Sequence, residues 1–156
     1  MEAGEENTES ADGRQPADPA VPEPLRRELV SELTAARQLA SEDPEAAGAR
    51  ARDAEVALGQ RGGPWGEPTA DGRRERLAAA MLALLRHRRP ESTICPSDAA
   101  RVAGGASWRD LMDTARDVAA ELARDGTIAV RQGGADVDVT TAIGPVRLAR
   151  GPGWRR

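Results

Sequence analysis

The stretch that decides the fold is residues 73–150, RRERLAAAMLALLRHRRPESTICPSDAARVAGGASWRDLMDTARDVAAELARDGTIAVRQGGADVDVTTAIGPVRLAR. Its first part holds apolar residues at helical spacing, in three runs separated by Pro90 and by Gly104-Gly105. Its last part holds two short alternating patterns, at 127–132 and 146–150, on either side of Gly133-Gly134. Three helices followed by a β-hairpin is the order of a winged helix. The sequence therefore predicts a mainly α fold with a small β-hairpin.

Local signals place the ends of these three helices. Asp71 is positioned to cap the first helix, and Cys95-Pro96 opens the second. The third is expected to start at Ser107, where Asp110 stands three residues later in a pattern like a capping box. Trp108 then begins its apolar stripe, which predicts that this side chain is buried against the first helix.

Two more helices are predicted upstream, at 24–40 and 43–58, and their short connection makes them an antiparallel hairpin. Such a hairpin is marginal alone, because its apolar stripe needs another surface. The surface is either the C-terminal domain or a second copy of the chain. We expect four parts: a disordered acidic tail (1–22), the helical hairpin (23–62), a linker (63–70) and a winged-helix domain (71–156) that folds on its own.

Charge is distributed unevenly along the chain. Residues 1–70 carry 15 acidic and 7 basic side chains, a net charge of −8, whereas residues 71–156 carry 11 acidic and 15 basic ones, a net charge of +4. A charge of +4 tolerates a polyanion but falls short of the strongly basic signature of most nucleic-acid binders.

Composition argues against several classes of protein. The chain has no Lys, so it holds no P-loop lysine, and its one His and one Cys are not spaced for a metal site. Asp136 and Asp138 lie in a predicted turn without an apolar pocket, so we expect no enzyme, cofactor or metal. Cys95, at a helix N-terminus, is the one candidate for a reactive thiol. The longest apolar run has nine residues against the ~20 of a membrane span, and the single Cys and the acidic N-terminus favour the cytoplasm.

Residues 73–150 resemble a bacterial family known as domain of unknown function 3253. The residues that carry the resemblance are Thr93-Ile94-Cys95-Pro96-Ser97, Ala100-Arg101, Trp108-Arg109, Leu111-Met112, Arg116, Leu122, Gly126, Ile128, Gln132, Gly134, Val137-Asp138, Gly144-Pro145 and Arg147. The sequence departs from the pattern at Val139, where relatives often have Pro. A segment at 57–65 is similar to a helical segment that precedes the domain in some actinobacterial members. The resemblance implies a winged-helix-like fold and no established activity.

Two functions remain open on this sequence. One is a weak, mainly electrostatic DNA-binding regulator, whose candidate contacts are Arg109, Arg116, Arg131, Arg147 and Arg150. Against it, the third helix carries more carboxylates than arginines, which opposes binding to phosphates. The other is a protein-interaction or adaptor module that uses the helical hairpin. The sequence gives neither the target nor the oligomeric state.

Overall fold

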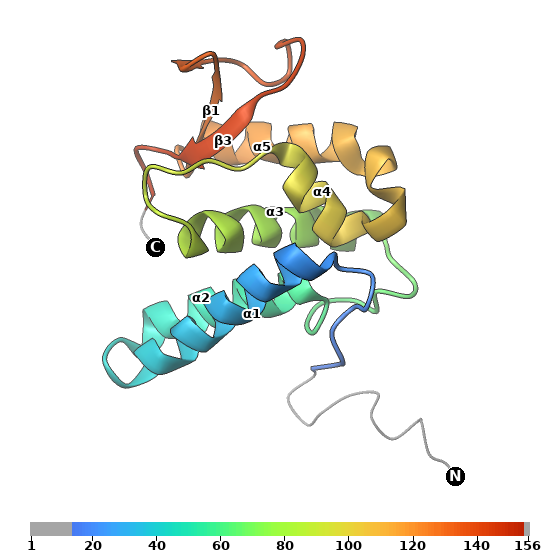
Figure 1. Ribbon diagram of the computed structural model, residues 1–156, viewed down its shortest axis with the longest axis vertical. Helices are drawn as coiled ribbons and strands as arrows, with labels where there is room; N and C mark the ends of the chain where they lie inside the picture. Colours follow the sequence, from blue (N-terminus) through green and yellow to red (C-terminus); the bar gives the residue numbers. More distant parts are fainter. Residues whose placement is uncertain (1–13, 155–156) are drawn as a thin grey trace.

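The helices of the computed structural model, which describes residues 14–154, are stacked in layers beneath a small sheet (Figure 1). The α-helices are α1 (Glu23–Gln38), α2 (Pro44–Leu58), α3 (Ala70–His87), α4 (Pro96–Gly104) and α5 (Met112–Arg124). The 3₁₀ helices are η2 (Leu39–Ser41) and η3 (Gly105–Leu111), and the strands are β1 (Ile128–Gln132), β2 (Ala135–Asp136) and β3 (Arg147–Arg150). The expected mainly α fold is confirmed. No helix within residues 14–154 is long and apolar enough to cross a membrane.

Helices α1 and α2 form the predicted hairpin, and α3 covers its apolar stripe. Asp43 caps α2, because its Oδ1 accepts the N–H of Ala46 at 3.1 Å. Leu29 and Leu33 of α1 belong to the same continuous cluster of buried side chains as Leu77 of α3. The linker at 63–70 therefore joins two parts of one core. This argues against independent folding of residues 71–156, which stays a prediction.

Ion pairs add to the apolar contact between the hairpin and α3. Arg86 of α3 is buried, and its Nη2 lies 2.9 Å from Oδ2 of Asp53 on α2. Glu32 of α1 is buried too: its Oε2 lies 3.6 Å from Nη1 of Arg86, and within the hairpin Arg50 of α2 donates two hydrogen bonds of 2.9 Å to the same carboxylate. Removing one member of such a buried group leaves a charge without compensation. Charge pairing thus fixes the hairpin on α3.

Residues 14–22, the last part of the predicted disordered tail, are ordered in the structure. Residues 1–13 lie outside the described part of the chain, but residues 14–22 pack against the α2–α3 connection (Figure 1). Val21 is buried, and Asp18 is buried with an ion pair of 2.9 Å to Arg76. The N–H of Asp18 also donates to the carbonyl of Leu58 at 2.8 Å. The composition of this segment did not reveal these partners, because they come from elsewhere in the chain.

Two predicted helix starts are wrong. Helix α3 is capped by Thr69 instead of Asp71, since Thr69 Oγ1 accepts the N–H of Gly72 at 2.9 Å. Ser107 caps nothing: the chain forms η3 there, and α5 begins only at Met112. A Cβ on Gly104 would lie 2.9 Å from Leu111 Cδ1, so Leu111 packs onto the backbone of Gly104. Ser107 lies at a kink inside η3, with φ of −98° and ψ of 22°, so no α-helix begins there.

Trp108 is half-buried instead of enclosed in the core, which corrects the prediction from its helical stripe. The guanidinium carbons of Arg101 and Arg109 lie 4.4 and 4.6 Å from the centroid of its ring. Cation–π contact with these two arginines holds the part of the indole that the core does not cover.

The sheet has three antiparallel strands in the order β2-β1-β3, where the sequence predicted two. Gly133 and Gly134 have φ of 61° and 84°, the left-handed pair that a two-residue hairpin turn needs, and they join β1 to the short β2. β1 and β3 pair from Ile128↔Arg150 to Arg131↔Arg147. Ile94, between α3 and α4, forms an isolated bridge with Leu148 on the other side of β3.

Candidate functional site

The outer face of α5 carries a row of carboxylates. Ala115, Val118 and Ala119 turn inward and are buried. Asp113, Asp117 and Glu121 are exposed and follow one another at intervals of four residues, which places them on one face of the helix. We call these three residues the acidic ridge. Glu121 forms an ion pair with Arg74 of α3, at the far end of the ridge from Asp113.

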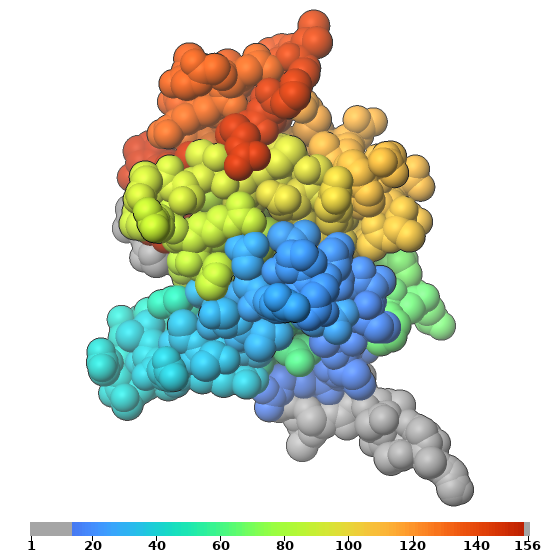
Figure 2. Space-filling view, viewed as in Figure 1, coloured from blue at the N-terminus to red at the C-terminus, as the bar shows by residue number. Residues whose placement is uncertain are grey.

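The segment that follows β1, residues 133–146, projects from the sheet beyond the helices, and we call it the wing (Figures 1 and 2). Val139 and Val146 are buried and anchor it in the core. Arg116 of α5 donates to the carbonyls of Val139 at 3.1 Å, Ala142 at 2.7 Å and Gly144 at 3.5 Å. Arg116 therefore holds the wing, and these bonds occupy the guanidinium group that the sequence analysis named as a candidate contact for phosphate.

A second set of bonds rigidifies residues 138–145, which we call the tip of the wing. Gln132 Nε2 donates to the carbonyls of Ile143 at 2.8 Å and Pro145 at 3.0 Å. Asp138 Oδ1 accepts the hydroxyl of Thr140 at 2.6 Å and its N–H at 2.9 Å. These two bonds, the hydroxyl first, lower the pKa of Asp138 from its ordinary value. The loop is thus fixed by side chains from α5, β1 and the loop itself.

Arg150 also bonds backbone groups of the protein itself. Its Nη2 donates to the carbonyls of Leu85, Arg86 and Arg88, at 3.1, 3.3 and 3.3 Å, where α3 ends. Its guanidinium lies 5.0 Å from the ring centroid of Trp154. A cation at the C-terminus of a helix is favoured by the helix dipole. Arg150 therefore terminates α3, which the sequence did not reveal.

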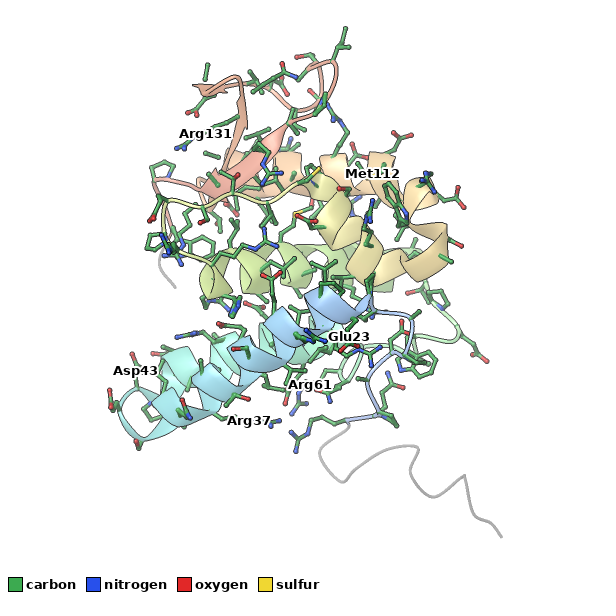
Figure 3. All side chains as sticks on the ribbon, viewed as in Figure 1. Glu23, Arg37, Asp43, Arg61, Met112 and Arg131 are labelled. Carbon is green, nitrogen blue, oxygen red and sulfur yellow. The ribbon has the colours of Figure 1, made fainter. Side chains whose placement is uncertain are left out.

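Arg109, Arg131 and Arg147 remain exposed, although each has a neighbour. Arg109 lies over Trp108, Arg131 Nε is 3.4 Å from Asp136 Oδ1, and Arg147 Nε donates to Thr93 Oγ1 at 2.8 Å. Figure 3 places Arg131 at the sheet end of the molecule, away from Asp43 at the tip of the hairpin. The five predicted arginines thus divide into two half-buried side chains, Arg116 and Arg150, and three exposed ones.

Residues 74–151 match the family described as "Protein of unknown function (DUF3253)", which covers half of the 156-residue chain. The chain belongs to the DUF3253 family. The match runs from α3 to the end of β3, so it contains the acidic ridge and the wing but not the hairpin. No curated protein matches the sequence.

Ile143, at the tip of the wing in the DUF3253 region, is a residue that the sequence analysis missed. Its side chain is 91% exposed. The other exposed large apolar residue within 14–154 is Val30 on α1, at 47%. The signal was one large apolar residue in the stretch 140–145, whose other residues are Thr, Ala, Gly and Pro.

Cys95 lies where it was predicted, at the start of α4 in the DUF3253 region, and is half-buried. Its backbone N–H donates to Oδ2 of Asp98 at 3.0 Å. Within residues 14–154 no group of three or more His, Cys, Asp or Glu side chains is placed to hold a metal ion. The contacts around Cys95 are those of a helix start.

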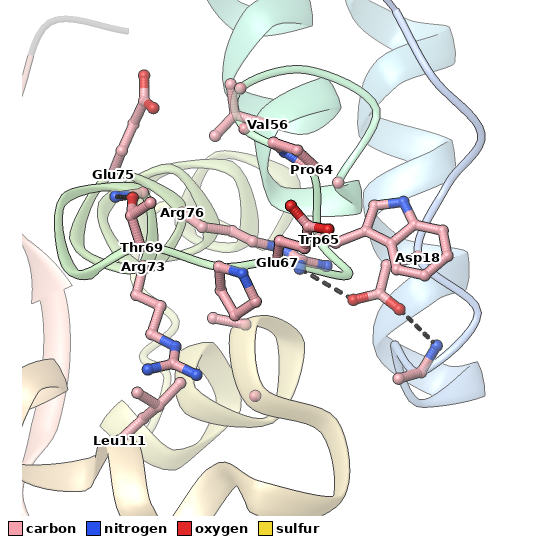
Figure 4. A pocket seen from close by; sticks show the side chains of 18 of the residues that line it. Asp18, Val56, Pro64, Trp65, Glu67, Thr69, Arg73, Glu75, Arg76 and Leu111 are labelled. Carbon is pink, nitrogen blue, oxygen red and sulfur yellow. Dashed lines mark hydrogen bonds and ion pairs between the residues drawn. The ribbon is translucent and has the colours of Figure 1, made fainter. Parts of the chain in front are cut away.

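A cavity of about 550 Å³ lies apart from the acidic ridge and the wing, none of whose residues line it. It is found where the N-terminal segment and the α2–α3 connection meet the DUF3253 region (Figure 4). Trp65, Arg73, Arg76, Asp18 and Leu111 are among the residues that line it. Trp65 Nε1 donates to the carbonyl of Pro16 at 3.0 Å, so the indole holds the N-terminal segment in place. The sequence could not show this cavity, because its walls come from three separate stretches of the chain, within 18–20, 56–76 and 103–111.

Proposed function

We propose that residues 70–151 form a winged helix that acts as a non-enzymatic module for binding another protein. The order α3, α4, α5, β1, wing and β3 is that of a winged helix. The bridge at Ile94 adds support, because Ile94 and Leu148 exchange two backbone hydrogen bonds, of 2.9 and 2.7 Å. A winged helix has a short strand at this place, between its first and second helices.

The charge on α5 favours a protein partner over duplex DNA, and this observation carries the proposal. In a winged helix of this order α5 takes the position of the helix that enters the major groove of DNA. Here its outer face holds Asp113, Asp117 and Glu121, and its Arg116 is bonded to the wing. Carboxylates that face phosphates oppose the release of counterions on which DNA affinity depends. A partner with a basic surface fits this face better than duplex DNA.

Weak DNA binding is the second candidate, and the exposure of Arg109, Arg131 and Arg147 favours it. These three lie on η3 and the sheet, so they could contact the phosphate backbone without α5 in the groove. Asp136 beside Arg131 reduces the positive charge available there. The hairpin is less well supported as a docking site, since its apolar stripe is buried against α3.

Fluorescence anisotropy of the full chain tests the proposal with two probes, labelled poly-L-lysine and a labelled DNA duplex. The variant Asp113→Asn/Asp117→Asn is compared with Glu42→Gln/Glu45→Gln, which removes the same charge from exposed positions on the hairpin. We expect poly-L-lysine to bind and the α5 variant, but not the hairpin variant, to weaken it. Equal losses in both variants would show only an effect of net charge and would refute the proposal. Duplex binding that falls on replacing Arg109, Arg131 and Arg147 by Ala would favour the second candidate instead.

A further inference from the structure

The tip of the wing presents one large apolar side chain to solvent on a loop built to hold it. Ile143 is 91% exposed. Isolated exposed apolar residues are common on protein surfaces and need no explanation by themselves. The loop around Ile143 is different, because several buried or specifically bonded groups fix its backbone.

Those groups bond the backbone of Ile143 and of its two neighbours in the sequence. Arg116 bonds the carbonyls of Ala142 and Gly144, the residues on either side of it, and Gln132 bonds the carbonyl of Ile143 itself. Gly144 has φ of +88°, which a residue with a side chain rarely adopts, and this turns the chain back towards β3. The position of Ile143 is therefore set before any partner arrives.

We infer that Ile143 is the apolar anchor of the partner-binding surface, and that its partner is a protein segment with an apolar residue flanked by basic ones. A preformed loop lowers the entropic cost of binding, and an aliphatic side chain that enters a pocket supplies affinity. This inference rests on the proposed function and names the contact through which the wing would act.

Charge around the tip selects the class of partner. Asp113 lies one helical turn before Arg116 on the same side of α5, so the bonds of Arg116 to Ala142 and Gly144 bring this part of the wing near the Asp113 end of the acidic ridge. Asp138 adds a carboxylate within the wing. Arg116 itself is turned into the loop, and the positive charge of Arg124 contributes to the lowered pKa of Asp138 after the bonds from Thr140. An apolar side chain beside carboxylates complements a basic peptide with an apolar residue, and it opposes a phosphate backbone.

The test uses a random peptide library displayed on phage and selected on the immobilised full chain. The selected peptides are then synthesised and titrated against the wild type, Ile143→Ser, Asp113→Asn/Asp117→Asn and Val30→Ser. Val30→Ser is the matched control, since it removes the other exposed large apolar side chain, on α1. All variants should keep the wild-type unfolding temperature within a degree or two, because the substituted side chains are exposed.

We expect the selection to enrich peptides in which Lys or Arg flanks a large apolar residue. Ile143→Ser should weaken them by about 10- to 100-fold, the value of burying one such aliphatic side chain, and Val30→Ser should not. Peptides that depend on Asp113 and Asp117 but not on Ile143 would overturn this inference and leave the proposed function standing. No enrichment, or peptides indifferent to both variants, would overturn both. A labelled DNA duplex bound more weakly by Ile143→Ser would overturn the choice of a protein partner.

Discussion

Leu29→Ala tests whether the hairpin and the DUF3253 region unfold as one unit. Leu29 is fully buried and belongs to the cluster that also contains Leu77 and Leu85 of α3. Truncating a buried Leu to Ala costs about 2–5 kcal/mol, from lost burial and the cavity left behind. A value near the middle, about 3 kcal/mol, is a large part of the ~5–15 kcal/mol that stabilises a typical domain. For a chain of this size it should lower the unfolding temperature by about 6–12 °C.

The assay compares two signals during thermal and urea unfolding. Far-UV circular dichroism follows all the helices, whereas tryptophan fluorescence follows Trp65, Trp108 and Trp154, which all lie outside the hairpin. If the core is shared, both signals shift together in Leu29→Ala. Val30→Ala is the control on the same helix, and it should change stability by less than about 0.5 kcal/mol because Val30 is half exposed.

A tryptophan transition that stays in place while part of the dichroism signal melts earlier would refute this reasoning. The hairpin would then be a separate unit, as its Gly- and Pro-rich linker suggests. Such a result would also support the prediction that residues 71–156 fold alone.

Three further predictions concern the residues that hold the DUF3253 region. Arg150→Ala should cost about 2 kcal/mol through the lost bonds to the carbonyls at the end of α3, measured by urea unfolding, and should leave DNA or heparin affinity unchanged. Arg116→Ala should speed amide hydrogen exchange at Ala142 in the wing by about tenfold, with little change in β1; equal protection in both proteins would contradict its role as a clamp. The pKa of Asp138 is lowered in the folded protein, so its stabilising bonds to Thr140 are present above pH 3.8 and are lost as the pH falls through the lowered pKa. An NMR titration of the Thr140 amide should therefore have a midpoint below 3.8, and a midpoint at or above it would contradict the assignment.

The sequence predicted those parts of the fold that depend on local signals. Asp43-Pro44 starts α2 and Gly59 ends it, and Pro96 starts α4, because capping and proline act within one turn of the chain. The alternation in β1 and the Gly133-Gly134 turn were visible for the same reason. The start of α5 was not visible, since the stretch before it forms η3, in which Leu111 packs against the backbone of Gly104 seven residues earlier.

The candidate site shows the same division. The sequence revealed which residues are charged, and so the acidic character of α5 was predictable. It could not reveal that Arg116 and Arg150 satisfy backbone carbonyls, because their acceptors lie 23 to 28 and 62 to 65 residues away. A sequence does not distinguish an arginine that bonds a backbone carbonyl from one that is exposed and able to bind a phosphate. Ile143 was overlooked because its exposure depends on the path of the whole loop.

The bridge between Ile94 and Leu148 has a consequence for the order in which the chain folds during its synthesis. The α1–α2 hairpin and its packing on α3 involve neighbouring segments, which can meet as soon as α3 has left the ribosome. The sheet is different, because Ile94 waits for a partner made 54 residues later, and β1 has no long neighbour until β3 exists. Between these two moments Ile94 and the apolar side of β1 lack the partners that β3 supplies, whereas α4 and α5 can already pack on α3. This interval is when the chain is most open to aggregation or to capture by a chaperone.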